Sequence, residues 1–215
     1  SGPVRRSASQ AMNEPLRPGH KGIGGGYEIE VGPRPTSITI KRRLRVARIV
    51  NGVLSLDDIR LSGKRVLYRV DINSPLHPET GAFLDDGRLR SIIPTLSALS
   101  DAKVVILGHQ SRPGRSDFTD LSGHADRISR ILGRPIRFIP DVCGEIAIDA
   151  IRSMNAGEIL CLDNVRMHAE EISLKKAGLE DLRLSQIVSN RAPEFDAYVT
   201  DAFGAAHRNS PTLTG

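Results

Sequence analysis

Four stretches of the sequence each place a basic side chain just past an apolar run of the kind that forms a buried strand, at residues 69–73, 108–113, 163–166 and 201–208. In a chain of alternating strands and helices, the carboxyl ends of parallel strands meet at one edge of the sheet. Arg112, Arg166 and Arg208 are therefore expected to point at one spot. A guanidinium pairs two phosphate or carboxylate oxygens at once and stays charged at physiological pH. The spacing predicts a site for a small, multiply charged anion such as a phosphate ester.

Imidazole and amide groups in the same stretches extend this site. His109 and His207 are expected to add hydrogen-bond donors, although each basic residue taken alone is more often an ordinary surface group. Asp71 and Asn73 are two residues apart and therefore share one face of an extended segment. An acceptor beside a donor suits a neutral hydroxyl. A turn before Pro75 is an equally good interpretation of Asp71.

Other chemistries find little support in the sequence. It has no Gly-x-Ser-x-Gly elbow, no His-Glu-x-x-His motif and no complete Walker loop. No metal site is predicted, because Asp85 and Asp86 fit a solvated turn better than a Mg²⁺ site. Cys143 and Cys161 form neither a disulfide framework nor a metal cluster, which favours a reduced, cytoplasmic protein. No apolar run approaches the roughly 18 residues of a membrane span, and no secretory signal is evident.

The positive charge is concentrated at the front of the 215-residue chain. Residues 1–50 hold ten Lys or Arg and three Asp or Glu, whereas the remainder holds twenty and twenty-two. Residues 1–53 are therefore interpreted as a basic, Gly/Pro-rich leader, with a small hairpin possible at 27–41. A solvated tail is the favoured interpretation, and contact with nucleic acid or an anionic surface is the alternative.

From residue 54 onward, short apolar runs alternate with segments of helical periodicity. The pattern predicts strands at 66–70, 104–107, 136–139, 158–162 and 197–200, and helices at 89–99, 120–132, 144–153 and 179–191. Gly133 is expected to end the second helix. Apolar strands between helices imply a parallel sheet covered on both faces. We therefore expect residues 54–215 to form a three-layer, doubly wound α/β domain of Rossmann-like type.

The quoted strings resemble the phosphoglycerate kinase family, and specifically its N-terminal, 3-phosphoglycerate-binding domain, over residues 54–215. Residues 66–75 resemble the family's Arg-Val-Asp-Phe-Asn-Val-Pro segment, and 108–113 resemble its His-x-Gly-Arg-Pro signature. Residues 163–166 resemble Glu-Asn-Leu-Arg, and 201–208 match the family's most recognisable string. Ile72, Ser74, 85–90 and 109–110 look like the archaeal branch.

The resemblance implies roles for individual residues. It assigns Asp71 and Asn73 to the hydroxyl and carboxyl end of the substrate and Arg88 to the transferring phosphoryl group. It assigns four residues to the substrate's phosphate: His109, Arg112, Arg166 and Arg208. The sequence departs from the family at Ser111, which replaces glycine, at Asp163, which replaces glutamate, and at Met167, where an aromatic is common. These changes are expected to alter the fit without removing a binding group.

The implied activity is that of a phosphotransferase with a carboxyl acceptor, acting between 1,3-bisphosphoglycerate and ADP to give 3-phosphoglycerate and ATP in glycolysis or gluconeogenesis. A carboxylate is already nucleophilic, so alignment and charge stabilisation are expected to carry catalysis. In the family, Mg-ATP or Mg-ADP binds a C-terminal nucleotide domain that follows the 201–208 string. The chain alone is therefore expected to bind 3-phosphoglycerate weakly and to be inactive. Neither a membrane nor nucleic acid is an expected partner. The alternative is a non-catalytic phospho-ligand-binding module with a nucleic-acid-contacting leader.

Overall fold

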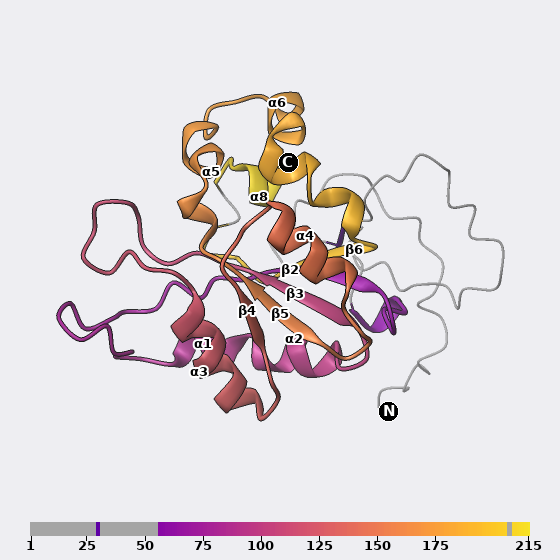
Figure 1. Cartoon of the computed structure of the whole chain (residues 1–215), viewed down its shortest axis with the longest axis horizontal. Helices are drawn as coiled ribbons and strands as arrows, with labels where there is room; N and C mark the ends of the chain where they lie inside the picture. Colours follow the sequence, from indigo (N-terminus) through magenta and orange to yellow (C-terminus); the bar gives the residue numbers. More distant parts are fainter. Residues whose placement is uncertain (1–28, 31–55, 206–207) are drawn as a thin grey trace, which may run out of the picture.

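The computed structural model of the chain describes residues 29–30, 56–205 and 208–215. A six-stranded sheet forms its centre (Figure 1). Across the sheet the strands run in the order β1 (Ile29–Glu30), β6 (Ala197–Thr200), β2 (Arg65–Arg69), β3 (Lys103–Leu107), β5 (Ile159–Leu162) and β4 (Arg137–Ile139). All neighbours from β6 to β4 are parallel, and β1 pairs antiparallel with β6. The five predicted strands are confirmed.

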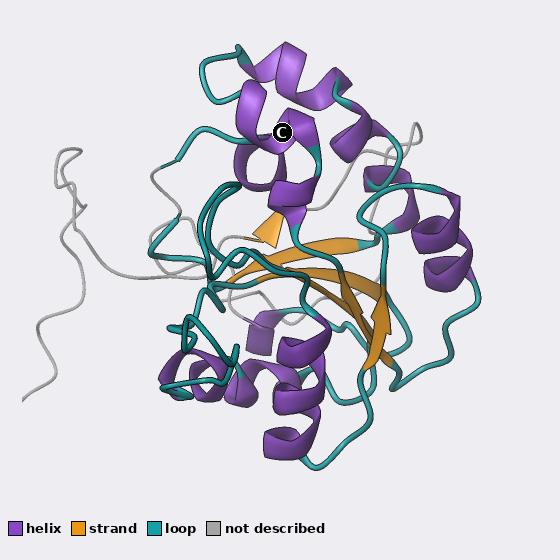
Figure 2. Cartoon of the chain, turned by 60° about the vertical axis from the view of Figure 1, so that its left-hand side comes forward, coloured by secondary structure: helices purple, strands orange, loops and turns teal. Residues whose placement is uncertain are grey.

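Helices cover both faces of the sheet, which gives the predicted three-layer α/β fold (Figure 2). One face carries α1 (Gly87–Ser91), α2 (Ile93–Ala98) and α3 (Ser122–Leu132). The opposite face carries α4 (Glu145–Arg152), α5 (Ala169–Ser173), α6 (Leu179–Leu184), α7 (Gln186–Ser189) and α8 (Pro211–Thr214). The described residues also form 3-10 helices at Leu56–Asp58, Val165–Met167 and Ala192–Glu194.

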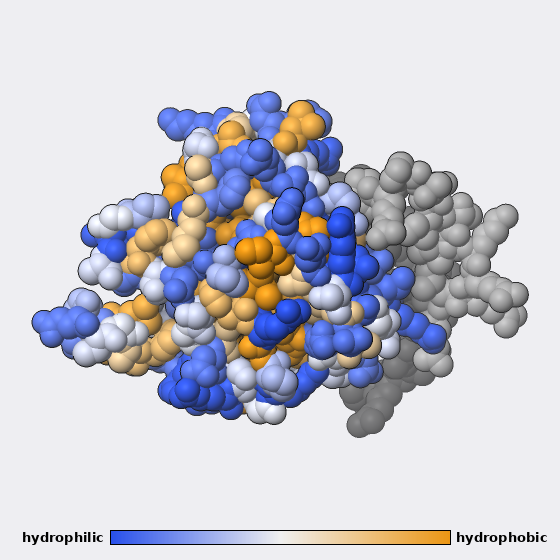
Figure 3. All heavy atoms as spheres, viewed as in Figure 1, coloured by the Kyte–Doolittle hydropathy of each residue, from blue (hydrophilic) through white to orange (hydrophobic). Residues whose placement is uncertain are grey.

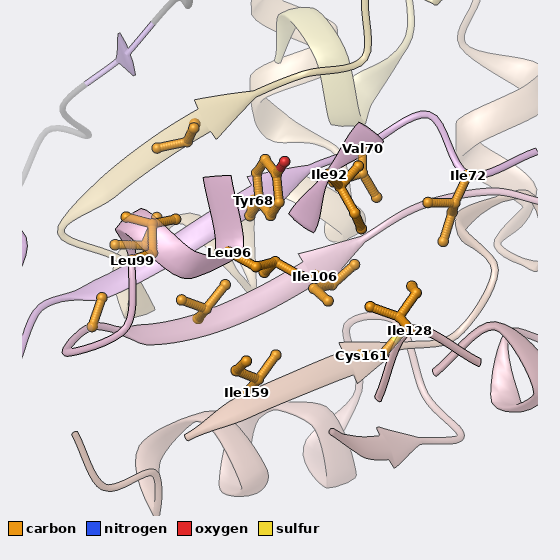
Figure 4. Close-up of a cluster of buried hydrophobic side chains, with 14 of the residues drawn as sticks. Tyr68, Val70, Ile72, Ile92, Leu96, Leu99, Ile106, Ile128, Ile159 and Cys161 are labelled. Atoms are coloured by element: carbon orange, nitrogen blue, oxygen red, sulfur yellow. The ribbon is translucent and has the colours of Figure 1, made fainter. Parts of the chain in front are cut away.

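The strands are buried on both sides because alternate side chains enter two different cores. On the α1–α3 face, Tyr68 and Ile106 pack with Ile92, Leu96 and other apolar side chains (Figure 4). On the other face, a second cluster forms around the remaining strand positions, with Val105, Leu107, Leu160, Leu162, Ala147 and Ile151. Each fully buried aliphatic side chain contributes about 1.5–3 kcal/mol, so the two cores together stabilise the sheet.

Two predicted helices are each divided in the structure. The segment 89–99 breaks at Ile92, which ends α1 and precedes α2. Pro94 has no N–H to donate to a carbonyl one turn earlier, so an uninterrupted ladder cannot form there. The segment 179–191 breaks at Ser185, whose ψ of 146° is extended and whose hydroxyl donates to the Leu182 carbonyl. Gly133 ends α3 as predicted, with a left-handed φ of 71°.

The possible hairpin at 27–41 lies outside the described residues except for Ile29 and Glu30, which form β1 beside β6. The surface in Figure 3 mixes hydrophilic and apolar residues, with apolar side chains reaching the surface near the middle of this face. Ile146 of α4 is 62% exposed. Among the described residues, no helix combines the length and the apolar character that crossing a bilayer would require.

Candidate functional site

The segments that follow β2, β3, β5 and β6 meet at the carboxyl edge of the sheet. Figure 1 shows two long loops leaving this edge, after β2 and after β3. The connections after β2 and β3 run to the α1–α3 face, whereas those after their outer neighbours β6 and β5 run to the opposite face, and such a divergence leaves a crevice for a ligand. A cavity of about 300 Å³ lies at this edge, lined by Arg69, His109, Arg112, Arg166, Glu171, Lys175, Ala205, Arg208, Asn209, Ser210 and Leu213.

Four of the seven residues to which the resemblance assigns a role line this cavity: His109, Arg112, Arg166 and Arg208. They come from three different loops, so only the fold brings them together. Counting all lining side chains, five cationic groups face one carboxylate, for a formal charge of +4. A concave site with this excess of positive charge selects a compact, multiply charged anion.

His109 is the neutral member of the cluster. It is 3% exposed, and burial, followed by the positive charge of the surrounding arginines, lowers its pKa to about 2. Its Nδ1 lies 3.3 Å from Nη2 of Arg69. Arginine can only donate, so Nδ1 must accept and Nε2 must carry the proton. His109 therefore offers one fixed N–H donor, with no charge that titrates near neutral pH.

Arg166 is held among like charges. Burial is the main cause that lowers its pKa, to about 10, and Arg208, Arg112 and Arg69 lower it further. Its Nη1 donates to the main-chain carbonyl of Ser111. An anion placed in the cavity would relieve the repulsion between these guanidinium groups, so the cavity is preorganised to bind a phosphate.

Arg69 also lines the cavity: it is the basic residue of the 69–73 stretch, but no ligand-binding role was predicted for it. Its side chain is 1% exposed, and burial is the main cause that lowers its pKa. The guanidinium is solvated by the protein itself: Nη1 donates to the carbonyls of Val70 at 2.6 Å and Leu107 at 3.2 Å, and Nε donates to Thr212 at 3.3 Å. Arg69 thus adds a fixed positive charge behind His109.

Glu171 and Lys175 also line the cavity. They were not predicted, because neither residue lies directly after a strand in the sequence. Glu171 is buried, and its carboxylate accepts hydrogen bonds from Ser210 at 2.8 Å and from Thr212 at 2.7 and 3.1 Å. It joins α5 to the start of α8 and to the segment that carries Arg208. The adjacent lysines of the 169–176 segment were the one available signal.

The other three predicted residues form a neighbouring group and do not line the cavity. Arg88 of α1 makes an ion pair with Asp71, whose side chain is 15% exposed, against 49% for Arg88. Asn73 accepts a hydrogen bond from the backbone N–H of Ser111 at 2.7 Å. The backbone of Gly204 passes close by, since a Cβ there would lie 2.5 Å from Oδ2 of Asp71. His207 lies outside the described residues.

The loop after β3 is anchored by buried amide and imidazole groups. The Gln110 side chain accepts from the Ser74 N–H at 3.0 Å and donates to the Ser74 carbonyl at 3.0 Å. His124 of α3 lies 3.1 Å from Gln110, and burial is the main cause that lowers its pKa to about 4. Asn164 donates to the Gln110 and Thr119 carbonyls at 2.8 Å each. These bonds fix the loop backbone beside Arg112 and Arg166.

A second, larger cavity of about 600 Å³ lies on the same side of the sheet as α7 and α8 and has mostly apolar walls. Arg191, which is 2% exposed, lines it. Its Nε donates to the Ile187 carbonyl at 2.6 Å, and its Nη1 finds no hydrogen-bond partner among the described residues. Burial lowers its pKa to about 10.

The carboxylates near α1 are engaged with the protein. Asp86 receives two hydrogen bonds from Nε of Arg127 and one from Nη2 at 2.7 Å, and Asp85 accepts from the Gly87 N–H at 2.9 Å. Within residues 56–205 and 208–215, no three carboxylate, imidazole or thiol groups gather where they could hold a metal ion.

The sequence matches the family model described as phosphoglycerate kinase over residues 56–215. Among curated proteins, it is 48% identical over 161 residues to a phosphoglycerate kinase from Methanocorpusculum labreanum and 45% identical over 163 residues to one from Methanothermobacter thermautotrophicus. Each match covers 75% of this chain and 39% of the relative. The chain thus spans about two fifths of the length of these relatives.

Solved structures show the same likeness. The crystal structure of phosphoglycerate kinase from Pyrococcus horikoshii superposes with a TM-score of 0.70 at 35% identity, covering 74% of this chain and 38% of that one. The structure from Coxiella burnetii gives a TM-score of 0.55 at 26% identity and covers 74% of this chain and 37% of that one. The sequence comparisons and the structural comparison therefore find similarity to the same group of proteins.

Proposed function

The chain belongs to the phosphoglycerate kinase family, and we propose that it supplies the 3-phosphoglycerate side of reversible phosphoryl transfer between 1,3-bisphosphoglycerate and ADP. The observation that carries the proposal is the cavity of about 300 Å³ with a formal charge of +4. Its size suits a three-carbon phosphate ester, and its charge is opposite to that of the ester. Arg112, Arg166 and Arg208 bind the phosphate oxygens, and neutral His109 donates one further hydrogen bond.

Asp71 and Asn73 recognise the hydroxyl and carboxyl end of the same molecule. Asp71 forms an ion pair with Arg88, and a free lone pair of its carboxylate can accept a hydrogen bond from the substrate hydroxyl. The Asn73 amide nitrogen can donate to an oxygen of the substrate, since its Oδ1 is already taken by the Ser111 N–H. The distance between this group and the arginines sets the length of substrate that fits.

Arg88 binds the phosphoryl group while it is being transferred. A pair that is half-exposed on one side contributes at most about 1 kcal/mol, so Arg88 can leave Asp71 at small cost. The substrate carboxylate needs no general base, because it is already ionised near neutral pH. The residues of this chain therefore act by fixing the phosphate end, orienting the carboxylate and neutralising the phosphoryl oxygens during transfer.

The nucleotide side of the reaction is proposed to come from the length of the relatives that this chain does not span. Mg-ATP or Mg-ADP, when bound there, supplies or receives the phosphoryl group. In a coupled ATP-forming assay we expect no turnover from the chain alone, and we assign the protein to the cytoplasm as a glycolytic kinase.

Calorimetric titration with 3-phosphoglycerate tests the binding role directly. We expect Arg208→Ala to weaken binding by about 10-fold or more, because removing one member of a desolvated charge pair costs about 2–5 kcal/mol and partial access of water reduces that cost. Arg127→Ala is the matched control, since Arg127 pairs with Asp86 and does not line the cavity. Binding that is absent in the wild type, or equal in both variants, would contradict the proposed function.

A further inference from the structure

Ser111 has a backbone conformation that side chains disfavour. Its φ is 53°, and it is the one non-glycine residue in the described part of the chain with a positive φ. In this region the Cβ of an L-residue lies too close to the following carbonyl oxygen. Glycine, which occupies this position in the family signature, adopts the same conformation without that crowding. Something in this chain must therefore hold serine in place.

The backbone of Ser111 joins the two halves of the proposed substrate site. Its N–H donates to Oδ1 of Asn73 at 2.7 Å, and its carbonyl accepts from Nη1 of Arg166. The first contact fixes an amide that follows β2, and the second fixes a guanidinium that follows β5. Rotating this one residue to a negative φ would redirect its N–H and release the Asn73 contact. It would also turn the adjoining peptide groups, including the carbonyl that holds Arg166.

Asp117 supplies the restraint on Ser111. The Ser111 hydroxyl donates to Oδ1 of Asp117, and the Asp117 carbonyl accepts from Nε2 of Gln110 at 3.3 Å. Residues 112–116, which lie between these partners, are exposed. Asp117 therefore closes the loop at the point where it returns to the protein, and it does so through the side chain whose backbone is strained. Asp117 does not itself line the cavity.

We propose that Asp117 is a positioning residue for 3-phosphoglycerate binding: it stabilises the left-handed Ser111, which in turn holds the Asn73 amide and the Arg166 guanidinium in register. The proposal rests on the proposed function. It predicts that removing the Asp117 carboxylate changes the affinity for 3-phosphoglycerate in the direction opposite to that expected from charge alone. Removing a carboxylate beside an anion site should strengthen anion binding by charge alone, whereas loss of positioning should weaken it.

A double-mutant cycle tests this coupling. In the wild-type background, Asp117→Ala is expected to weaken 3-phosphoglycerate binding by about 5- to 10-fold, in line with the cost of a left-handed L-residue. In the Ser111→Gly background the same change should have less than about a twofold effect, because glycine needs no restraint. Asp117→Asn, which keeps the accepting oxygen, should retain most of the affinity. Equal effects of Asp117→Ala in both backgrounds, or tighter binding, would overturn the proposal.

Nuclear magnetic resonance of the ligand-free chain provides a readout that does not depend on the substrate. Asp117→Ala should shift the Asn73 side-chain amide and the Ser111 backbone amide, and neither signal should move when it is introduced into Ser111→Gly. Unchanged signals in the wild-type background would refute the positioning role. If the wild-type chain fails to bind 3-phosphoglycerate, the proposed function fails, and the resonances alone then decide whether Asp117 holds the loop.

Discussion

Replacing Arg166 by methionine should change ligand binding and stability in different directions. Burial and the neighbouring arginines lower its pKa from 12.5 to about 10. At about 1.4 kcal/mol per pKa unit this corresponds to roughly 3 kcal/mol against the folded, charged form. Because the side chain is only half-buried, solvent screening reduces this to about 1–2 kcal/mol. Loss of the hydrogen bond to Ser111 costs about 1 kcal/mol in return.

We therefore expect Arg166→Met to leave the free energy of unfolding of the ligand-free chain unchanged or to raise it by up to about 1 kcal/mol, relieving repulsion between like charges. Affinity for 3-phosphoglycerate should fall by about 30-fold or more, since a desolvated charge partner of the phosphate is lost. Urea denaturation measures the first quantity and calorimetric titration the second. Wild-type protein measured in parallel provides the reference for both.

Arg152→Met is the matched control for this experiment. Hydrogen bonds from Arg152 to Glu194, at 3.1 and 2.8 Å, raise the pKa of this arginine, the reverse of the effect at Arg166. Its replacement should lower stability and leave 3-phosphoglycerate affinity intact. If Arg166→Met destabilises the chain as Arg152→Met does while binding is retained, then the arginines do not form a strained cluster awaiting an anion, and the electrostatic reasoning is wrong.

Three further changes follow from the same geometry. In the unfolded chain His109 takes up a proton near pH 6.5, whereas its pKa in the folded chain is about 2, so this residue should lower the free energy of unfolding by about 2 kcal/mol between pH 7.5 and 5. His109→Gln keeps an acceptor for Arg69 and should flatten the dependence of the free energy of unfolding on pH; an unchanged slope would refute the assignment. Gly204→Ala should displace Asp71 and weaken 3-phosphoglycerate binding in a titration, with little loss expected for inorganic phosphate; equal losses for both ligands would place the damage elsewhere. Arg191→Met should leave the free energy of unfolding unchanged or raise it by about 1 kcal/mol, because a buried guanidinium whose Nη1 has no partner among the described residues is replaced by an apolar group. A clear loss of stability in urea denaturation would show that the charge is compensated.

The sheet could be predicted from sequence because its strands are buried on both faces and read as short apolar runs between helices. The helix boundaries could not, since apolar periodicity continues through positions where the backbone breaks. Pro94 marks one such position in the sequence itself. The break at Ser185, whose ψ is 146°, has no comparable signal, because serine is tolerated within helices.

The convergence of arginines was predictable for a topological reason. Parallel strands bring residues that follow each strand to a common edge whatever their separation in sequence, so Arg112, Arg166 and Arg208 meet at one cavity. Cavity-lining residues that do not follow a strand could not be predicted in this way. Glu171 and Lys175 enter from α5 and the segment after it, and their approach depends on how the helices pack on the sheet.

Arg69 belongs to one of the four basic stretches, yet its role in the site could not be predicted, because it lies inside a strand. A cation within a buried strand is expected to be excluded from a core, because transfer from water is costly unless polar groups replace its hydration. Here the carbonyls of Val70 and Leu107 do so, and both are main-chain groups whose positions depend on sheet pairing. The strand register thus fixes a charge that in turn fixes the tautomer of His109. A donor that is neutral and oriented among cations gives the phosphate a directional contact in addition to attraction, and the sheet itself is what provides it.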